Sequence, residues 1–126
     1  MKKIITALLA AAATLALAAD KPDRDPIRVG IKDGRPDVQE YYAITTQEHG
    51  GLRWSAPEGY RFPADGIAFD DSQSKGKYDC KPTDGGNQFR CKKRSHVRHT
   101  RDKYNVKLID AAGNALPVLD PYILSN

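Results

Sequence analysis

The sequence of 126 residues predicts an all-β fold with one disulfide. We expect a small antiparallel β-sandwich of about seven short strands. Three observations predict it. Short stretches that alternate apolar and polar residues recur along the chain, turn-forming residues separate them at close spacing, and no long amphipathic helical pattern competes with them.

Residues 1–18 have the composition of a secretory signal peptide. Lys2 and Lys3 precede an apolar stretch, and Ala16-Leu17-Ala18 matches an A-x-A cleavage site. The stretch is too short to span a bilayer as a mature helix. Cleavage after Ala18 leaves 108 of the 126 residues and lowers the formal net charge from +4 to +2. We therefore expect one small periplasmic or secreted domain, which argues against multidomain enzymes, transmembrane proteins and cytosolic proteins.

The mature chain divides into a flexible lead-in, residues 19–26, and a single β-sandwich domain, residues 27–126. The lead-in is charged and contains two prolines. Ile27, Val29 and Ile31 alternate with polar residues and indicate the first strand, which a turn over residues 33–37 follows. Residues 38–46 could open as a helix after the turn, but their alternation and their Tyr-Tyr and Thr-Thr pairs favour a strand.

After Gly50 and Gly51 the pattern predicts further short strands separated by turns. A polar loop is expected over residues 70–76, and an irregular basic loop over residues 94–102. Pro121 confines the last strand to a sheet edge or to a strand start. The expected strands cover residues 52–54, 67–69, 77–80, 89–93, 103–110 and 118–124. This number of short strands is typical of a sandwich or a barrel.

The two cysteines, Cys80 and Cys91, are expected to form a disulfide, because disulfides persist in exported proteins. Their C-x10-C spacing crosses a turn and differs from the C-x-x-C of redox sites. A hairpin with a four-residue loop over residues 84–87 keeps Pro82 out of a hydrogen-bonded pair and places the cysteines opposite each other. Closing this small ring stabilises the fold by about 3 kcal/mol.

Positive charge is concentrated late in the chain. Residues 74–107 carry eleven Lys and Arg against three Asp, whereas residues 20–73 carry seven basic and eleven acidic residues. Such a patch attracts polyanions, for example lipopolysaccharide phosphates or anionic glycans. The alternative is a solvated loop whose charges protect an edge strand. No aromatic residue interrupts the basic run, so nucleic acid is not expected as a partner. The candidate binding residues are Arg90, Lys92, Lys93, Arg94, Arg98 and Arg101.

Neither a metal site nor a cofactor site is predicted. His96 and His99 form an H-x-x-H pattern, but two imidazoles among fixed cations are a poor start for a divalent metal, and His49 helps only if folding brings it across. We expect the histidines to tune the charge of the basic run with pH. The acidic residues Asp65, Asp70 and Asp71 lack the spacing of a calcium loop and are read as turn and cap residues.

Catalysis is not expected either. A small secreted hydrolase would draw on Glu58, on His96 or His99, and on an arginine, but their spacing matches no acid–base pattern. The chain contains no Gly-x-Ser-x-Gly, His-Glu-x-x-His or phosphate-loop motif.

Five short motifs mark the fold. They are Leu52-Arg-Trp54, Gly66-Ile-Ala-Phe69, the Cys80 and Cys91 pair, Lys103-Tyr-Asn-Val-Lys-Leu108 and Leu119-Asp-Pro-Tyr-Ile123. Together they resemble small exported bacterial β-sandwich proteins, immunoglobulin- or cupredoxin-like and of unassigned function. The resemblance implies an immunoglobulin-like layout and no established activity. A cupredoxin copper site would need a Cys–His–Met cluster, and the only methionine is Met1.

The sequence thus predicts a non-catalytic, exported binding or accessory module. Its basic run is expected to meet an anionic partner, either a polyanion or another protein. The alternative is an inhibitor or immunity-type domain that acts through protein interaction, and a small secreted hydrolase is the less favoured third hypothesis. No membrane span is expected in the mature chain.

Overall fold

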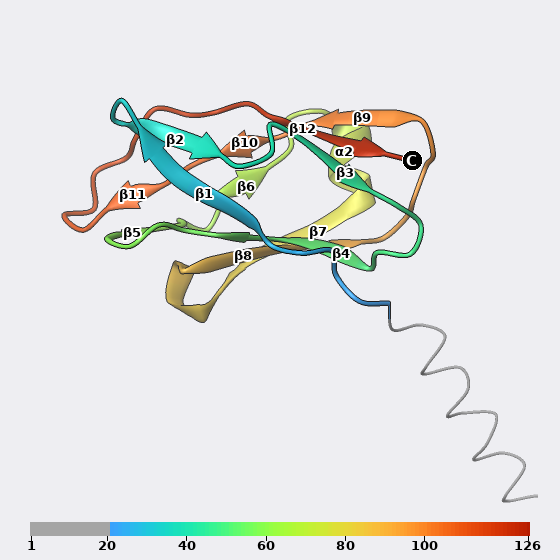
Figure 1. Ribbon diagram of the computed structural model, residues 1–126, viewed down its shortest axis with the longest axis horizontal. Coiled ribbons are helices and arrows are strands. Elements are labelled where there is room, and N and C mark those ends of the chain that lie inside the picture. Colours follow the sequence, from blue (N-terminus) through green and yellow to red (C-terminus); the bar gives the residue numbers. More distant parts are fainter. Residues whose placement is uncertain (1–20) are drawn as a thin grey trace, which may run out of the picture.

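The computed structural model describes residues 21–126, in which strands predominate (Figure 1). This part of the chain forms twelve strands in several small sheets, one short α-helix and one 3₁₀ turn. The predicted signal peptide, residues 1–18, lies outside the described residues. The all-β prediction is confirmed as a mostly-β fold, with one helix that the pattern did not predict.

The largest sheet has five strands in the order β2-β1-β4-β8-β7. Its strands are β1 (Ile27–Lys32), β2 (Arg35–Val38), β4 (Gly51–Ser55), β7 (Tyr78–Thr83) and β8 (Gln88–Lys93). The turn between β1 and β2 needs only Asp33 and Gly34, whose φ angles are 53° and 76°, so it is tighter than predicted. Pro36 is tolerated because β2 is an edge strand.

A three-stranded sheet in the order β3-β12-β9 lies above β4, β7 and β8 in the view of Figure 1. Its strands are β3 (Tyr42–Thr45), β9 (Thr100–Lys103) and β12 (Tyr122–Ser125). Four two-residue strands complete the described fold as two small pairs. They are β5 (Tyr60–Arg61) with β11 (Ile109–Asp110), and β6 (Ile67–Ala68) with β10 (Asn105–Val106).

The prediction of a purely antiparallel fold is wrong at two places. β1 and β4 pair in parallel, with Ile27 beside Trp54, and β3 and β12 pair in parallel, with Tyr42 beside Tyr122. Both pairs join strands that are separated by a long connection, as parallel pairing requires. Alternation of apolar and polar residues is the same for both directions, so the sequence pattern does not reveal the parallel pairs.

Several predicted strands are shorter or divided. Residues 103–110 were expected to form one strand, but β9, β10 and β11 share this stretch and pair with β12, β6 and β5 in turn. Its alternation is nevertheless real, since Tyr104, Val106 and Leu108 are all buried. β9 also takes in residues of the predicted basic loop, and only residues 42–45 of the predicted strand 38–46 form β3.

The predicted polar loop over residues 70–76 is wrong, because helix α2 (Ser72–Lys77) occupies most of it. Asp71 caps this helix: its carboxylate accepts hydrogen bonds from the Ser74 backbone N–H, at 3.2 Å, and from the Ser74 hydroxyl, at 3.3 Å. The helix contains no apolar residue, so hydrophobic periodicity cannot reveal it in the sequence.

The stapled hairpin is confirmed. Cys80 and Cys91 form the disulfide and pair directly across β7 and β8, with Pro82 opposite Phe89. Thr83 and Gln88 close the ladder, which leaves the predicted four-residue loop. The two cysteine Cα atoms are 4.0 Å apart, the close spacing typical of a pair that exchanges no backbone hydrogen bonds.

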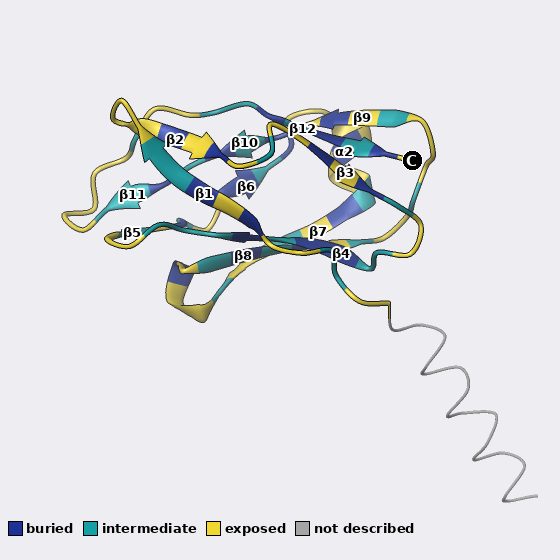
Figure 2. Cartoon of the chain, viewed as in Figure 1, coloured by how far each residue is buried: buried dark blue, intermediate teal, exposed yellow. Residues whose placement is uncertain are grey.

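The core lies between the five-stranded sheet and the strands above it, and Figure 2 shows buried segments in the strands of both layers. Trp54 of β4 is fully buried, and its Nε1–H donates to the Tyr104 hydroxyl at 3.1 Å. Phe69 stacks on Tyr78 with ring centroids 4.7 Å apart. Phe69 also contacts Tyr104, with ring centroids 6.1 Å apart, so these rings link β4 and β7 to the segment that follows β9. Lys92, Lys93 and Arg94 lie at the open end of the β7–β8 hairpin.

Candidate functional site

The six predicted binding residues do not gather at a single site. Arg90 and Lys92 lie within β8, whereas Lys93 ends that strand and Arg94 follows it. The two remaining residues, Arg98 in the loop before β9 and Arg101 on β9, are exposed. The structure therefore separates the basic run into distinct surroundings, which are described in turn.

Arg90 is engaged in an ion pair on the outer side of the large sheet. Its Nε and Nη2 donate to the two carboxylate oxygens of Asp23, at 2.8 and 3.0 Å. Arg53, its partner across β4 and β8, donates to the same carboxylate at 2.8 Å. The hydrogen bond from Arg90 lowers the pKa of Asp23 below its ordinary value. Asp23 thus balances much of the positive charge at this place.

Lys93 and Arg94 line a pocket of about 320 Å³ at the open end of the hairpin. Lys21 and the segment before β4 form the opposite wall. Gly50 joins these walls, because its carbonyl accepts from the Lys93 backbone N–H at 3.0 Å and its own N–H donates to the Pro22 carbonyl at 2.8 Å. A Cβ on Gly50 would meet the Lys21 backbone. The lining residues are Lys21, Gln47, His49, Gly50, Lys93, Arg94, Ser95 and His96, and none of them is acidic.

Lys93 is the unusual group of this cationic pocket. Its ammonium donates to the Thr46 carbonyl at 2.8 Å and to His96 Nδ1 at 3.0 Å, both of which are neutral acceptors. Six Lys and Arg residues among residues 21–126 are half-buried, and the other five each have a carboxylate in an ion pair. Burial, and then the charge of Lys21, lower the pKa of Lys93 to about 8.

The hydrogen bonds fix the proton positions of both histidines in the pocket. His49 Nδ1 accepts from the Thr46 backbone N–H at 3.1 Å, so a neutral His49 carries its hydrogen on Nε2. His96 Nδ1 accepts from Lys93, so its Nε2–H donates to the main-chain oxygen of Asn126 at 2.7 Å. Burial first, and then the charges of Lys93 and Arg24, lower the pKa of His49. Within residues 21–126, no group of three potential metal-ligating side chains is present.

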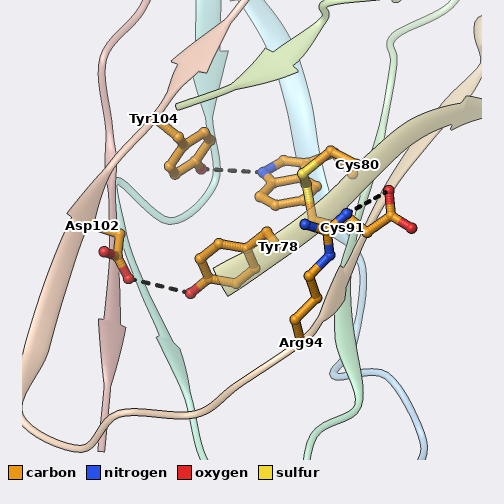
Figure 3. The surroundings of a disulfide bond; sticks show 8 residues. Tyr78, Cys80, Cys91, Arg94, Asp102 and Tyr104 are labelled. Atoms are coloured by element: carbon orange, nitrogen blue, oxygen red, sulfur yellow. Dashed lines mark hydrogen bonds and ion pairs between the residues drawn. A yellow bond between two sulfur atoms is a disulfide. The ribbon is translucent and has the colours of Figure 1, made fainter. Parts of the chain in front are cut away.

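A second cluster near the pocket centres on Asp102, which the sequence analysis left in a loop. Asp102 is only 3% exposed and accepts from Ser74 Oγ at 2.7 Å and from Lys77 Nζ at 3.0 Å. Figure 3 shows the Tyr78 hydroxyl directed at Asp102, and that distance is 3.3 Å. Burial and the charge of Asp102 raise the pKa of Tyr78. Because Ser74 and Asp102 are buried, this cluster is a structural ion pair that holds α2 against β9.

The outer face of the three-stranded sheet carries exposed aromatic and aliphatic side chains. Tyr42 and Ile44 of β3 are 54% and 49% exposed. The Tyr42 and Tyr122 rings stack with centroids 5.6 Å apart, and the Arg101 guanidinium lies over the Tyr122 ring at 5.0 Å. We call these residues, together with Tyr41, the tyrosine face. Arg101 therefore belongs to different surroundings from Lys93 and Arg94.

Lys21 and His49 are two ionisable residues of the cationic pocket that lie outside the predicted basic run. Lys21 was assigned to the lead-in, yet residues 22 and 24 are hydrogen-bonded to Gly50 and Gly51. His49 was considered only as a metal ligand. The Gly-Gly pair before the strand is the signal that could have found them, since adjacent glycines mark a close backbone approach.

Comparison with known proteins does not assign the chain to a family. No family model matches the chain, and no curated protein is significantly similar to it in sequence. In the part of the chain that the structure describes, no helix is long and apolar enough to cross a membrane.

Proposed function

We propose that this protein is an exported, non-catalytic binding module that holds an anionic group of its partner in the cationic pocket. The partner is a polyanion such as lipopolysaccharide or an anionic glycan. Lys93 is the central contact, and Lys21 and Arg94 add charge at the rim of the pocket. Lys92 and Arg98 contribute to long-range attraction, because both are exposed.

The surroundings of Lys93 carry this proposal. A half-buried ammonium that touches only neutral acceptors and faces a second lysine is electrostatically costly. Proteins remove such a cost with a counter-charge, as this chain does for its other half-buried cations. An anion from a partner would supply the missing counter-charge at Lys93.

Retention on immobilised heparin at increasing salt tests the proposal. We expect the wild type to bind at low ionic strength and to elute as salt screens the attraction. Lys93→Met should elute at clearly lower salt than Lys92→Met, although both variants lose one charge from the same strand. Equal elution of the two variants would remove the pocket from the proposal, and no retention of the wild type would contradict anion binding altogether.

Export and the finer fold class belong to the same proposal. The signal-like composition of residues 1–18 and the Cys80–Cys91 disulfide support a periplasmic or secreted location. An immunoglobulin-like sandwich is supported by the buried Trp54 of β4 between the layers. The two parallel strand pairs depart from a simple form of that layout. N-terminal sequencing of the secreted protein should begin at Ala19, and retention of Met1 would contradict export by this signal.

The tyrosine face favours a second candidate function, an inhibitor or immunity-type domain. Tyrosine and arginine are enriched at the energetic centres of protein interfaces, and here the rings are already ordered by stacking. A complex isolated from the exporting cell should be lost in Tyr42→Ser and kept in Lys93→Met. Loss in Lys93→Met alone would assign the interaction to the pocket instead.

A further inference from the structure

We propose that the cationic pocket is specific for a phosphate monoester, which it binds as the dianion while Lys93 keeps its proton. The inference rests on the proposed anion-binding function and adds the ligand class and a proton linkage. Three properties of the pocket support it: its polar side chains are mainly hydrogen-bond donors, it contains several positive charges, and burial beside Lys21 makes Lys93 easier to deprotonate than an ordinary lysine.

The polar groups that the pocket offers are mainly donors. Lys21 and Lys93 provide ammonium groups, Arg94 provides a guanidinium, and Ser95 provides a hydroxyl. His49 offers Nε2–H, because its Nδ1 already accepts from the backbone of Thr46. A phosphate group that has lost both protons has no O–H donor left, so all its free oxygens act as acceptors. Such a group matches a lining of donors.

The nearby charges leave the pocket positive. The Lys21 ammonium donates to the Gln47 carbonyl at 2.8 Å, a neutral group. Arg94 has the Asp79 carboxylate 3.8 Å away, but both side chains are more than half exposed, so this contact is weak. Arg24, Asp25 and Glu48 act on His49, and Arg24 is already paired with Glu40. The main-chain oxygen of Asn126, the last residue of the chain, accepts from His96 at 2.7 Å, so its negative charge reaches Lys93 only through the His96 ring.

This excess of positive charge favours a dianion over a monoanion. At pH 7.5 a phosphate monoester carries nearly two negative charges, because its second pKa is about 6. A sulfate ester or a carboxylate carries one charge and has similar oxygen acceptors. One added charge a few ångströms from three cations, in surroundings partly screened by water, strengthens binding by about tenfold.

The same contact links binding to protonation. Burial and the charge of Lys21 already favour the neutral form of Lys93, so its pKa is about 8. A bound dianion favours the ammonium form and raises that pKa. Above pH 8, therefore, the free pocket has lost part of its charge and must take up a proton to bind, whereas near pH 7 Lys93 is charged already.

Isothermal titration calorimetry tests the preference for a dianion and the linked proton uptake separately. At pH 7.5 we expect glucose 6-phosphate to bind about tenfold more tightly than glucose 6-sulfate. At pH 8.5, in two buffers of different ionisation enthalpy, binding of the phosphate ester should take up a large part of one proton. Inorganic phosphate tests whether the free ion suffices, and vesicles containing phosphatidic acid test a lipid phosphate as the source.

Variants identify the group responsible. Lys93→Met should abolish the proton uptake and reduce the preference for phosphate, whereas Lys92→Met should keep both. Lys21→Met, a change at an exposed residue, should weaken phosphate binding and raise the pKa of Lys93, which keeps the test open should Lys93→Met fold poorly.

The outcomes separate this inference from the proposed function. Equal affinity for the two esters, or binding at pH 8.5 without proton uptake, overturns the inference, while salt-dependent retention on heparin would still support anion binding. Absence of both ester binding and heparin retention overturns the inference and the proposed function together.

Discussion

Two lysines at the open end of one hairpin meet opposite surroundings. Lys77 precedes β7 and donates to both oxygens of Asp102, at 3.0 and 3.2 Å, and to Thr100 at 3.2 Å. Lys93 ends β8 and touches only the Thr46 carbonyl and the His96 ring, with Lys21 nearby. Backbone pairing brings them close together, because Arg94, the residue after Lys93, donates its N–H to the Lys77 carbonyl at 2.7 Å.

The difference shows how a function can be inferred where no motif exists. The Lys77–Asp102 pair is buried and fully hydrogen-bonded, so it is explained by the packing of α2 against β9. Lys93 has no such explanation within residues 21–126, since burial and the charge of Lys21 disfavour its charged form and its two hydrogen-bond acceptors are neutral. An electrostatic cost that the folded protein does not compensate indicates a partner that supplies the counter-charge.

The largest effect is expected from breaking the compensated pair. Asp102→Ala leaves the ammonium of Lys77 buried without a counter-charge and should lower the free energy of unfolding by about 3–5 kcal/mol. Urea denaturation followed by circular dichroism measures this loss. A loss below about 1 kcal/mol, the range of an exposed ion pair, would mean that the cluster is open to water.

The double variant Lys77→Met/Asp102→Leu is the control for that prediction. It removes both charges together and should recover most of the lost stability, because well-packed apolar residues commonly replace a buried ion pair at little cost. A double variant as unstable as Asp102→Ala would show that packing, and not the unpaired charge, causes the loss.

The next effect concerns the staple that holds both lysines in one hairpin. Replacing both cysteines, Cys80→Ala/Cys91→Ala, should lower the free energy of unfolding by about 3 kcal/mol, because the unfolded chain gains freedom. Reduction of the wild-type disulfide should give a similar loss in the same urea experiment. Unchanged stability in both would show that the hairpin is held by its packing alone.

The smallest effect is expected at Lys93 itself. Lys93→Met loses two hydrogen bonds and the repulsion from Lys21, so stability at pH 7 should change by less than about 1 kcal/mol. The pH dependence of the free energy of unfolding distinguishes the wild type from Lys93→Met. An unfolded lysine keeps its proton up to about pH 10.5, whereas folded Lys93 releases it at about 8, so the unfolded state binds more protons between these values.

The stability of the wild type relative to Lys93→Met should therefore rise with pH between 8 and 10.5. Below pH 8 the difference between the two proteins should be constant. Comparison with the variant cancels the other groups that titrate in this range, including the buried tyrosines. A difference that is flat above pH 8 would contradict the lowered pKa.

Much of the fold could be predicted from the sequence, because the determining signals are local. The hairpin, its four-residue loop and the opposed cysteines follow from turn residues and from the missing N–H of Pro82. The parallel pairs could not be predicted, since they depend on which distant strands meet. Helix α2 could not be predicted from hydrophobic spacing, because a cap from Asp71 stabilises it instead.

The candidate site could be predicted only in part. The basic run identified Lys93 and Arg94, but alternation along β8 places Arg90 on a face where Asp23 pairs with it. Lys21 and His49 enter the pocket through contacts between segments remote in the sequence. Asp102 lies in the same basic run, and only strand β9 determines that it points inward.

A direct titration of Lys93 tests the central claim. Nuclear magnetic resonance of the lysine side chains, with the Lys93 signal assigned from the spectrum of Lys93→Met, gives its pKa in the intact protein. The account predicts a midpoint of about 8 in the free protein, rising when glucose 6-phosphate is added. A midpoint near 10.5 in the free protein would show that Lys93 is not an uncompensated charge and would contradict the account.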